Sequence, residues 1–150
     1  MHAELTLSDL TALSGLDVLD HLDREVTVPV TSGLQAQGDL IVIPYAVVSA
    51  AIQPAPWARS IAVPRSGIEL LRSAAGGNPH CLVADEGTCI WTTSVQDTMR
   101  LALGIIETTG IAYLLHPEHG ATGIAPGCYV VRRQRERGAG RLGPPLLVAD

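Results

Sequence analysis

After Glu25 the chain consists of short apolar runs separated by turn-forming residues, and this pattern constrains the fold more than any other feature. Glycine, asparagine, aspartate and proline separate the runs, as in Gly76-Gly77-Asn78 and Pro126-Gly127. Short strands spaced about 8–12 residues apart with such turns are typical of all-β sandwiches and barrels. We therefore expect a mainly β fold, a small barrel or sandwich. The runs lie at 26–30, 39–45, 60–64, 68–72, 80–84, 89–93, 111–115, 128–133 and 146–150.

Two segments do not fit this simple alternation. Residues 46–58 could begin as a helical turn, which the Pro54-Ala55 and Pro56-Trp57 steps then break. Residues 94–107 could form one short helix, or a turn that leads into a strand at 100–106. Because the segment lies within a series of strands, we favour the strand.

The N-terminal segment 5–24 is the best helical stretch. Ser8 is the expected N-cap, and Gly15 is expected to split the segment into two short helices. Aspartates fall between the leucines, which gives an acidic amphipathic element that packs on the rest of the domain. The leucines recur every three residues at Leu10, Leu13, Leu16, Leu19 and Leu22.

The chain of 150 residues is long enough for one domain with a core, and we expect a single domain over 1–150. Its acidic helical segment is 1–25, and the β-rich barrel or sandwich is 26–150. No apolar run reaches the ~18–20 residues of a spanning helix, so we expect no membrane partner. The N-terminus lacks a basic and apolar leader and the three cysteines form no CxxC pair, so we expect a cytoplasmic protein.

Two histidines and a glutamate lie together in the segment His116-Pro117-Glu118-His119. Pro117 and the glycines that follow disfavour a continuous helix. We therefore predict that the strand at 111–115 runs into a turn here, where the side chains can still converge.

Imidazoles with a carboxylate suit zinc, iron or manganese, so a divalent transition metal is the cofactor that this corner would hold. His80 begins another apolar run and is the expected third imidazole, and Cys81 and Cys128 come next. The candidate metal ligands are His80, His116, Glu118 and His119. Two other interpretations of these residues stay open. They are ordinary polar residues of a loop, or the histidines act in general acid–base catalysis.

Three stretches, 38–44, 76–83 and 116–136, resemble a group of small bacterial proteins of unassigned function. The resemblance spans roughly residues 26–137 and rests on three motifs: a His-x-Glu-His turn, a Pro-Gly-x-Tyr turn and an Arg-Gln-Arg-Glu segment. The chain is also broadly similar to the cupin family, whose small double-stranded β-helix often holds a metal on histidines and a glutamate. That similarity implies a metal-dependent enzyme, although fold alone does not fix function.

Arginine is concentrated in residues 130–137. In a continuous strand, alternation would place Arg133, Arg135 and Arg137 on one face, where they could line a phosphate backbone. No aromatic residues are interleaved with them, and the net charge of −5 argues against a general polyanion binder. Acidic side chains near the N-terminus are their expected partners, in the same protomer or in a neighbouring copy: Asp17, Asp20 and Asp23.

Each cysteine lies at the start of an expected strand, and we expect Cys81, Cys89 and Cys128 to be buried structural thiols. Cys81 follows His80, but adjacent residues on a strand point to opposite faces, which argues against a Cys–His nucleophile pair.

The chain lacks the motifs GxGxxG, GxxxxGK[ST], GxSxG and HExxH, and it lacks lysine. The sequence therefore indicates no catalytic residue, and it favours a binding protein over an enzyme. We expect a binding or accessory protein with a ligand or partner site near His80, His116 and His119. The first alternative is a metal-dependent cupin-like enzyme that uses the same residues. The second is an RNA- or protein-binding accessory whose contacts are Arg133, Arg135, Arg137 and Tyr129, and a homo-oligomer is a further option.

Overall fold

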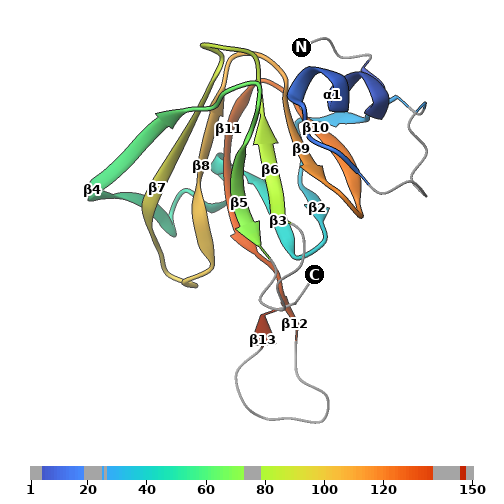
Figure 1. The fold of residues 1–150 in the computed structure, drawn as a ribbon. Coiled ribbons are helices and arrows are strands. Elements are labelled where there is room, and N and C mark those ends of the chain that lie inside the picture. The colour runs from blue at the N-terminus through green and yellow to red at the C-terminus, as the bar shows by residue number, and fades with distance from the viewer. Residues whose placement is uncertain (1–4, 19–24, 26, 73–78, 137–145, 148–150) are drawn as a thin grey trace.

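A computed structural model describes residues 5–18, 25, 27–72, 79–136 and 146–147 of the chain. Two β-sheets face one another, and a short helix lies against the outside of one of them (Figure 1). The expected mainly β fold is confirmed in its sandwich form, because the two sheets are not closed into a barrel. None of the helices in the described residues is long and apolar enough to span a membrane.

Neighbouring strands are antiparallel throughout, except that β1 and β10 run parallel. In spatial order the five-stranded sheet contains β1 (Val30–Thr31), β10 (Gly120–Ile124), β9 (Ala112–His116), β6 (Pro79–Val83) and β5 (Ile68–Arg72). The six-stranded sheet contains β2 (Gln35–Gln37), β3 (Leu40–Pro44), β11 (Gly127–Arg133), β8 (Ala102–Thr108), β7 (Cys89–Asp97) and β4 (Ile52–Ala62). A separate pair joins β12 (Arg135–Glu136) to β13 (Leu146–Leu147).

The main core lies between the two sheets, because alternate residues of each strand point inward. On β6, for example, Leu82 belongs to this core, whereas its neighbour Val83 packs on the outer face. Aliphatic side chains supply most of the core, since the chain contains no phenylalanine. Its largest buried members are Leu40, Val42, Val63, Leu82, Trp91, Ile106, Leu114, Ile124, Tyr129 and Val131.

Helix α1 (Leu7–Ser14) packs through Leu10 on the outer face of the five-stranded sheet. Its N-cap is Thr6 rather than the expected Ser8, because Thr6 and Asp9 form a reciprocal capping box. The helix ends at Gly15, which adopts the left-handed conformation with φ of +76°. The expected second half of this element, residues 19–24, lies outside the described residues.

Helix α2 (Tyr45–Val48) covers part of the outer face of the six-stranded sheet and confirms the expected helical turn. This helix ends before Pro54 and Pro56, as expected, and the segment that contains the two prolines is strand β4. Both are tolerated because β4 is the edge strand of its sheet, where a missing N–H removes no ladder bond on the open side. The strand expected at 100–106 is confirmed as β8.

Candidate functional site

The sequence HPEHG forms the corner between β9 and β10. Strand β9 ends at His116, residues 117–119 turn, and β10 begins at Gly120 with φ of +81°. Gly120 is the register partner of His116, so the turn closes a tight hairpin. The predicted strand-to-turn corner is confirmed.

His80 joins this corner from the neighbouring strand β6. The pairing of Cys81 with Leu115 across β6 and β9 places His80 beside His116, on the inner face of the sheet. The ring centroids lie 4.4 Å apart for His80 and His116, and 4.5 Å apart for His116 and His119. The rings of His80 and His119 are stacked at 6.3 Å. We call these three residues the histidine corner, and their predicted convergence is confirmed.

Both ring nitrogens of His80 face oxygen acceptors in the buried end of the sandwich. Nδ1 lies 3.0 Å from Oε1 of Gln37, and Nε2 lies 2.9 Å from Oδ1 of Asp39. The amide of Gln37 is fixed in this orientation because its Nε2 donates to the carbonyl of Leu114 at 2.9 Å. This arrangement is satisfied when the His80 ring carries two protons, or when Asp39 holds one of them.

His116 has the opposite role, since its Nδ1 accepts hydrogen bonds. The backbone N–H groups of Glu118 and His119 donate to it at 3.0 and 3.3 Å. Its Nδ1 is therefore unprotonated, and the ring carries its proton on Nε2. These bonds tie the turn to the end of β9.

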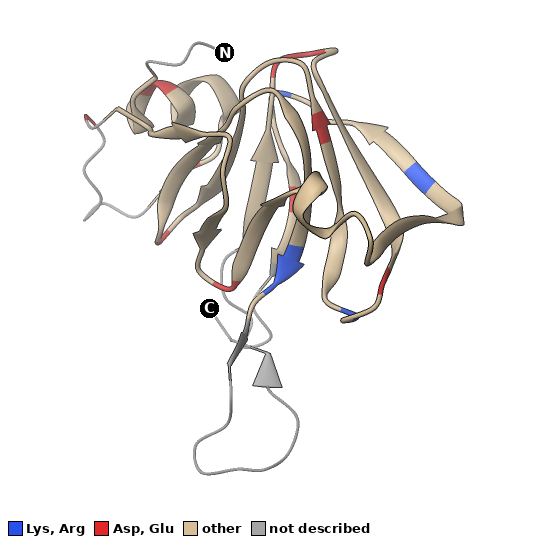
Figure 2. Ribbon diagram, turned by 180° about the vertical axis from the view of Figure 1, so that it is seen from behind, with Lys and Arg blue, Asp and Glu red and all other residues tan. Residues whose placement is uncertain are grey.

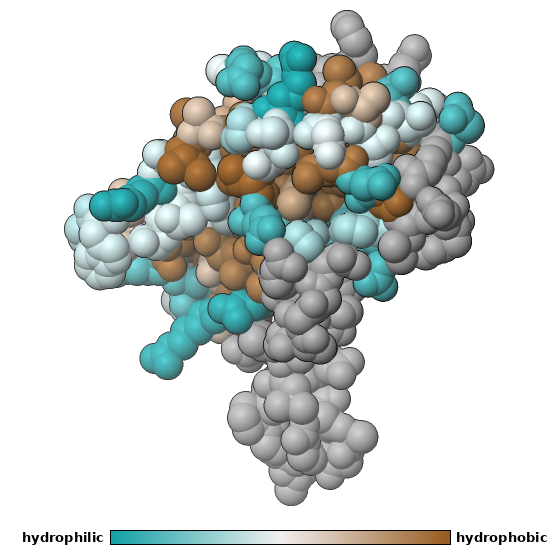
Figure 3. Space-filling view, viewed as in Figure 1, coloured by the Kyte–Doolittle hydropathy of each residue, from teal (hydrophilic) through white to brown (hydrophobic). Residues whose placement is uncertain are grey.

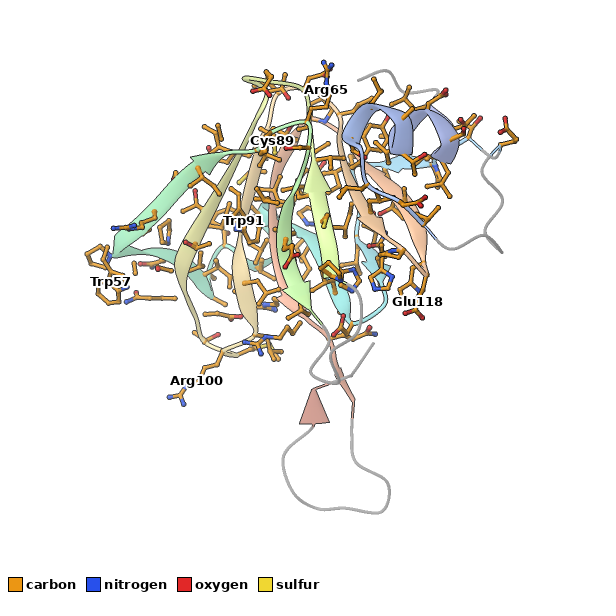
Figure 4. The ribbon with its side chains drawn as sticks, in the orientation of Figure 1. Trp57, Arg65, Cys89, Trp91, Arg100 and Glu118 are labelled. Atoms are coloured by element: carbon orange, nitrogen blue, oxygen red, sulfur yellow. The ribbon has the colours of Figure 1, made fainter. Side chains whose placement is uncertain are left out.

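Burial separates the inner from the outer members of the corner. His80 is 0% exposed and His116 is 1% exposed, whereas Glu118 and His119 are exposed. Figure 4 shows Glu118 at the lower end of the hairpin, pointing away from the sheets. Within the described residues, no group of three or more His, Cys, Asp or Glu side chains is arranged to hold a metal ion. Metal binding at the histidine corner stays a prediction.

A small hollow lies on the outer face of the five-stranded sheet, directly behind the histidine corner. Its volume is about 60 Å³ and its surface is mostly apolar. Because neighbouring residues on a strand point to opposite faces, the residues that flank His80 and His116 line it. Hydrophobic side chains gather on this face of the molecule in Figure 3. The lining residues are Leu16, Asp17, Pro79, Cys81, Leu115 and Pro117.

The continuous strand on which the arginine face depends is interrupted at Gln134. Strand β11 ends at Arg133, Gln134 separates it from β12, and the register against β8 shifts between Val131 and Arg132. Arg132 is buried and bonded to Asp97, while Arg135 belongs to the separate strand β12. Arg137 lies outside the described residues.

Of the three expected acidic partners of the arginines, Asp17 lies within the described residues. Helix α1 packs on the five-stranded sheet, whereas Arg133 ends a strand of the other sheet. Asp17 lines the hollow, and Asp20 and Asp23 lie outside the described residues. Tyr129 is buried in the core, where its hydroxyl donates to the carbonyl of Ala125 at 2.7 Å, so it offers no surface contact.

The cysteines divide into two buried thiols and one exposed thiol. Cys81 and Cys89 are buried as expected, but Cys128 is exposed. Burial raises the pKa of Cys89 to about 11, although a hydrogen bond with Thr108 opposes the shift. Cys128 differs because it lies on the outer face of β11, beside Glu107 of β8.

Comparison with known proteins places the chain in a family. It belongs to the family described as a domain of unknown function (DUF8820), whose sequence model matches residues 36–134. That range contains Gln37, Asp39 and the whole histidine corner. No curated protein and no solved structure matches the chain.

Proposed function

We propose that the protein is a cytoplasmic binding or accessory protein whose site is the hollow behind the histidine corner. The occupant is a small apolar group of a ligand or partner. The observation that carries this proposal is which residues line the hollow. Four of its residues, Pro79, Cys81, Leu115 and Pro117, are the immediate chain neighbours of His80 and His116.

The buried network supports binding because it fixes the two strands that form the hollow. Gln37 connects to His80 on β6 through its oxygen and to Leu114 on β9 through its nitrogen. His116 holds the following turn through its Nδ1. A site whose supporting strands are locked in this way loses little conformational entropy when it is filled.

The chemistry of the hollow favours a branched aliphatic group. Water takes up about 30 Å³ per molecule in the liquid, so the hollow has room for a group of only a few heavy atoms. Leu16 and Leu115 supply methyl groups to its walls, and Asp17 adds a carboxylate to its lining. A leucine or valine side chain of a partner has the required size and polarity.

A titration with a small probe tests this proposal. N-acetyl-leucinamide should shift the ¹³C-methyl signals of Leu16 and Leu115, which line the hollow. N-acetyl-glycinamide lacks the branched side chain and should leave these signals unchanged. Cys81→Val, which adds a methyl group to the lining, should reduce the response, whereas Cys128→Val should not. An equal response to both probes, or in both variants, would contradict the proposal.

A second candidate is a metal-dependent cupin-like enzyme that uses His80, His116, Glu118 and His119. The close approach of three imidazole rings favours it. Metal would have to replace a hydrogen bond of His80 or His116, with a zinc–nitrogen distance of about 2.0–2.1 Å. Tag-free protein that carries a stoichiometric transition metal, lost in His116→Ala and His119→Ala, supports the enzyme. Metal-free protein with unchanged stability in EDTA contradicts it.

A further inference from the structure

Strand β4 (Ile52–Ala62) forms an outer edge of the six-stranded sheet and lies away from the hollow and the histidine corner (Figure 1). It pairs with β7 on one side, and no strand within the described residues pairs with its other side. An open strand edge offers unpaired N–H and C=O groups to another chain. The edge of β4 is therefore a surface on which a further strand can pair.

The register shows which backbone groups face outward. The N–H of Val63 donates to the carbonyl of Cys89, and Ile61 pairs with Trp91. Inward and outward bonding alternate along an antiparallel strand. Ile61 therefore bonds to β7 like Val63, and Ser60 and Ala62 direct their N–H and C=O groups to the open side.

The first half of β4 is closed to such pairing. Pro54 and Pro56 have no N–H, and the register shifts between Pro54 and Arg59. Ser94, opposite this bulge, has a positive φ of +63°, a conformation uncommon for a non-glycine residue. Any added strand is confined to the half of β4 that follows the bulge.

Two large apolar side chains are exposed along this edge. Trp57 is 68% exposed and Ile61 is 49% exposed. Figure 4 shows Trp57 at the far corner of the sandwich, pointing away from the sheets. Tryptophan is enriched among the residues that contribute most to protein–protein binding.

We propose that β4 pairs antiparallel with β4 of a second copy of this chain, about a two-fold axis beside Ile61. Ser60 of each copy then exchanges backbone hydrogen bonds with Ala62 of the other. Ile61 faces Ile61 of the second copy in a non-hydrogen-bonded pair, in which side chains approach most closely. The two six-stranded sheets become one continuous sheet.

Charge is compatible with this self-pairing. Arg59 is the only charged residue of β4, and the strand is otherwise uncharged in Figure 2. In the proposed register, Arg59 lies opposite Val63 of the second copy. The two Arg59 positions are separated by about 14 Å along the strands, beyond the ~8–10 Å over which exposed charges interact in salt.

The surface area that this strand pair can bury agrees with a reversible dimer. A stable interface buries about 800 Å² from each partner, and a tryptophan contributes about 150–250 Å² when it is fully covered. The proposed pairing runs only from Arg59 to Val63, and Trp57 lies before it within the bulge, so the strand pair centred on Ile61 buries less than about 800 Å² from each copy. The dimer should therefore dissociate on dilution.

Sedimentation equilibrium of the full chain over a wide concentration range tests the proposal. The wild type should shift from monomer to dimer as its concentration rises. Ile61→Lys and Ile61→Glu should each raise the dimer dissociation constant at least about tenfold, because like charges then face each other. Since Ile61 is half-exposed, both variants should fold, which circular dichroism checks.

Mixing these two variants tests the register itself, because the introduced ammonium and carboxylate groups would face each other across the axis and restore association. Ile90→Lys is the matched control, since Ile90 is similarly exposed but lies on β7, one strand away from the edge. It should dimerise like the wild type. A wild type that stays monomeric at every concentration overturns the proposal and leaves the edge to a strand of another protein. A mixture no more associated than its components overturns the register.

Discussion

Arg132 on β11 holds Asp97 at the end of β7 through two hydrogen bonds. Nε of Arg132 donates to Oδ2 of Asp97 at 3.1 Å, and Nη2 donates to Oδ1 at 2.9 Å. The same carboxylate accepts the backbone N–H groups of Met99, Leu101 and Ala102, at 2.8 to 3.0 Å. The Asp97 side chain is 1% exposed and that of Arg132 is 10% exposed. This pair therefore ties the β7–β8 turn to the neighbouring strand of the sheet.

Asp97→Asn should lower the free energy of unfolding by about 3–5 kcal/mol, the usual cost of breaking a buried ion pair. Asparagine keeps the size of the side chain, but it leaves the Arg132 guanidinium buried without its counter-charge. Chemical denaturation measures the effect. The matched control is Asp85→Asn, because Arg65 and Asp85 form an ion pair of 2.8 Å whose side chains are 48% and 30% exposed. The control should cost at most about 1 kcal/mol, and equal losses would contradict the assigned role.

The same pair predicts a pH dependence of stability. Burial alone would raise the pKa of Asp97, but the N–H groups of Met99 and Leu101 and the Arg132 guanidinium outweigh it and hold the pKa below its usual value. A depressed folded-state pKa means that the stabilisation is complete above the unfolded value of about 3.9 and is lost as the pH falls below it. The stability difference between the wild type and Asp97→Asn should therefore be constant near neutral pH and shrink below about pH 4. A difference that grows on acidification would refute the assignment.

Cys128 should be the thiol that reacts in the folded protein, since it is exposed while Cys81 and Cys89 are buried. Burial, and then the charge of Glu107, raise the pKa of Cys128, so little of the reactive thiolate is present at neutral pH. Alkylation by iodoacetamide, followed by peptide mass spectrometry, should be slow at pH 7 and faster at higher pH. Glu107→Gln should accelerate it. Labelling of Cys89 at the same rate would show that the fold opens locally.

Local signals in the sequence were sufficient to predict the corner between β9 and β10. Pro117 and Gly120 require a turn there, whatever the rest of the chain does. The continuous strand expected through the arginines is interrupted for a tertiary reason. A register shift at Val131 and the interruption at Gln134 change the alternation that a continuous strand would have kept.

Strand β10 shows what local pattern cannot reveal. Its sequence GATGI has low strand propensity, and it forms a strand because β9 and β1 pair with it on both sides. At Gly123 a Cβ atom would lie 2.5 Å from Cγ2 of Val30, so glycine is needed for this close pairing. The partners of His80 are equally hidden, because Gln37 and Asp39 lie 43 and 41 positions before it, and no spacing connects them.

Gln37 gives the most direct test of the buried network. Gln37→Ala should reduce the free energy of unfolding by about 1–3 kcal/mol, because the Nδ1 of His80 and the carbonyl of Leu114 each lose a buried hydrogen-bond partner. The matched variant His119→Ala removes an exposed ring of the same corner and should change stability by no more than about 0.5 kcal/mol.

Long-range ¹H–¹⁵N spectra provide a readout that a general loss of packing would not move. His116 should be in the Nε2–H tautomer in the wild type and in both variants, since its Nδ1 bonds to the turn and not to Gln37. A His116 that carries its proton on Nδ1 would contradict the hydrogen-bond assignment on which the histidine corner is built.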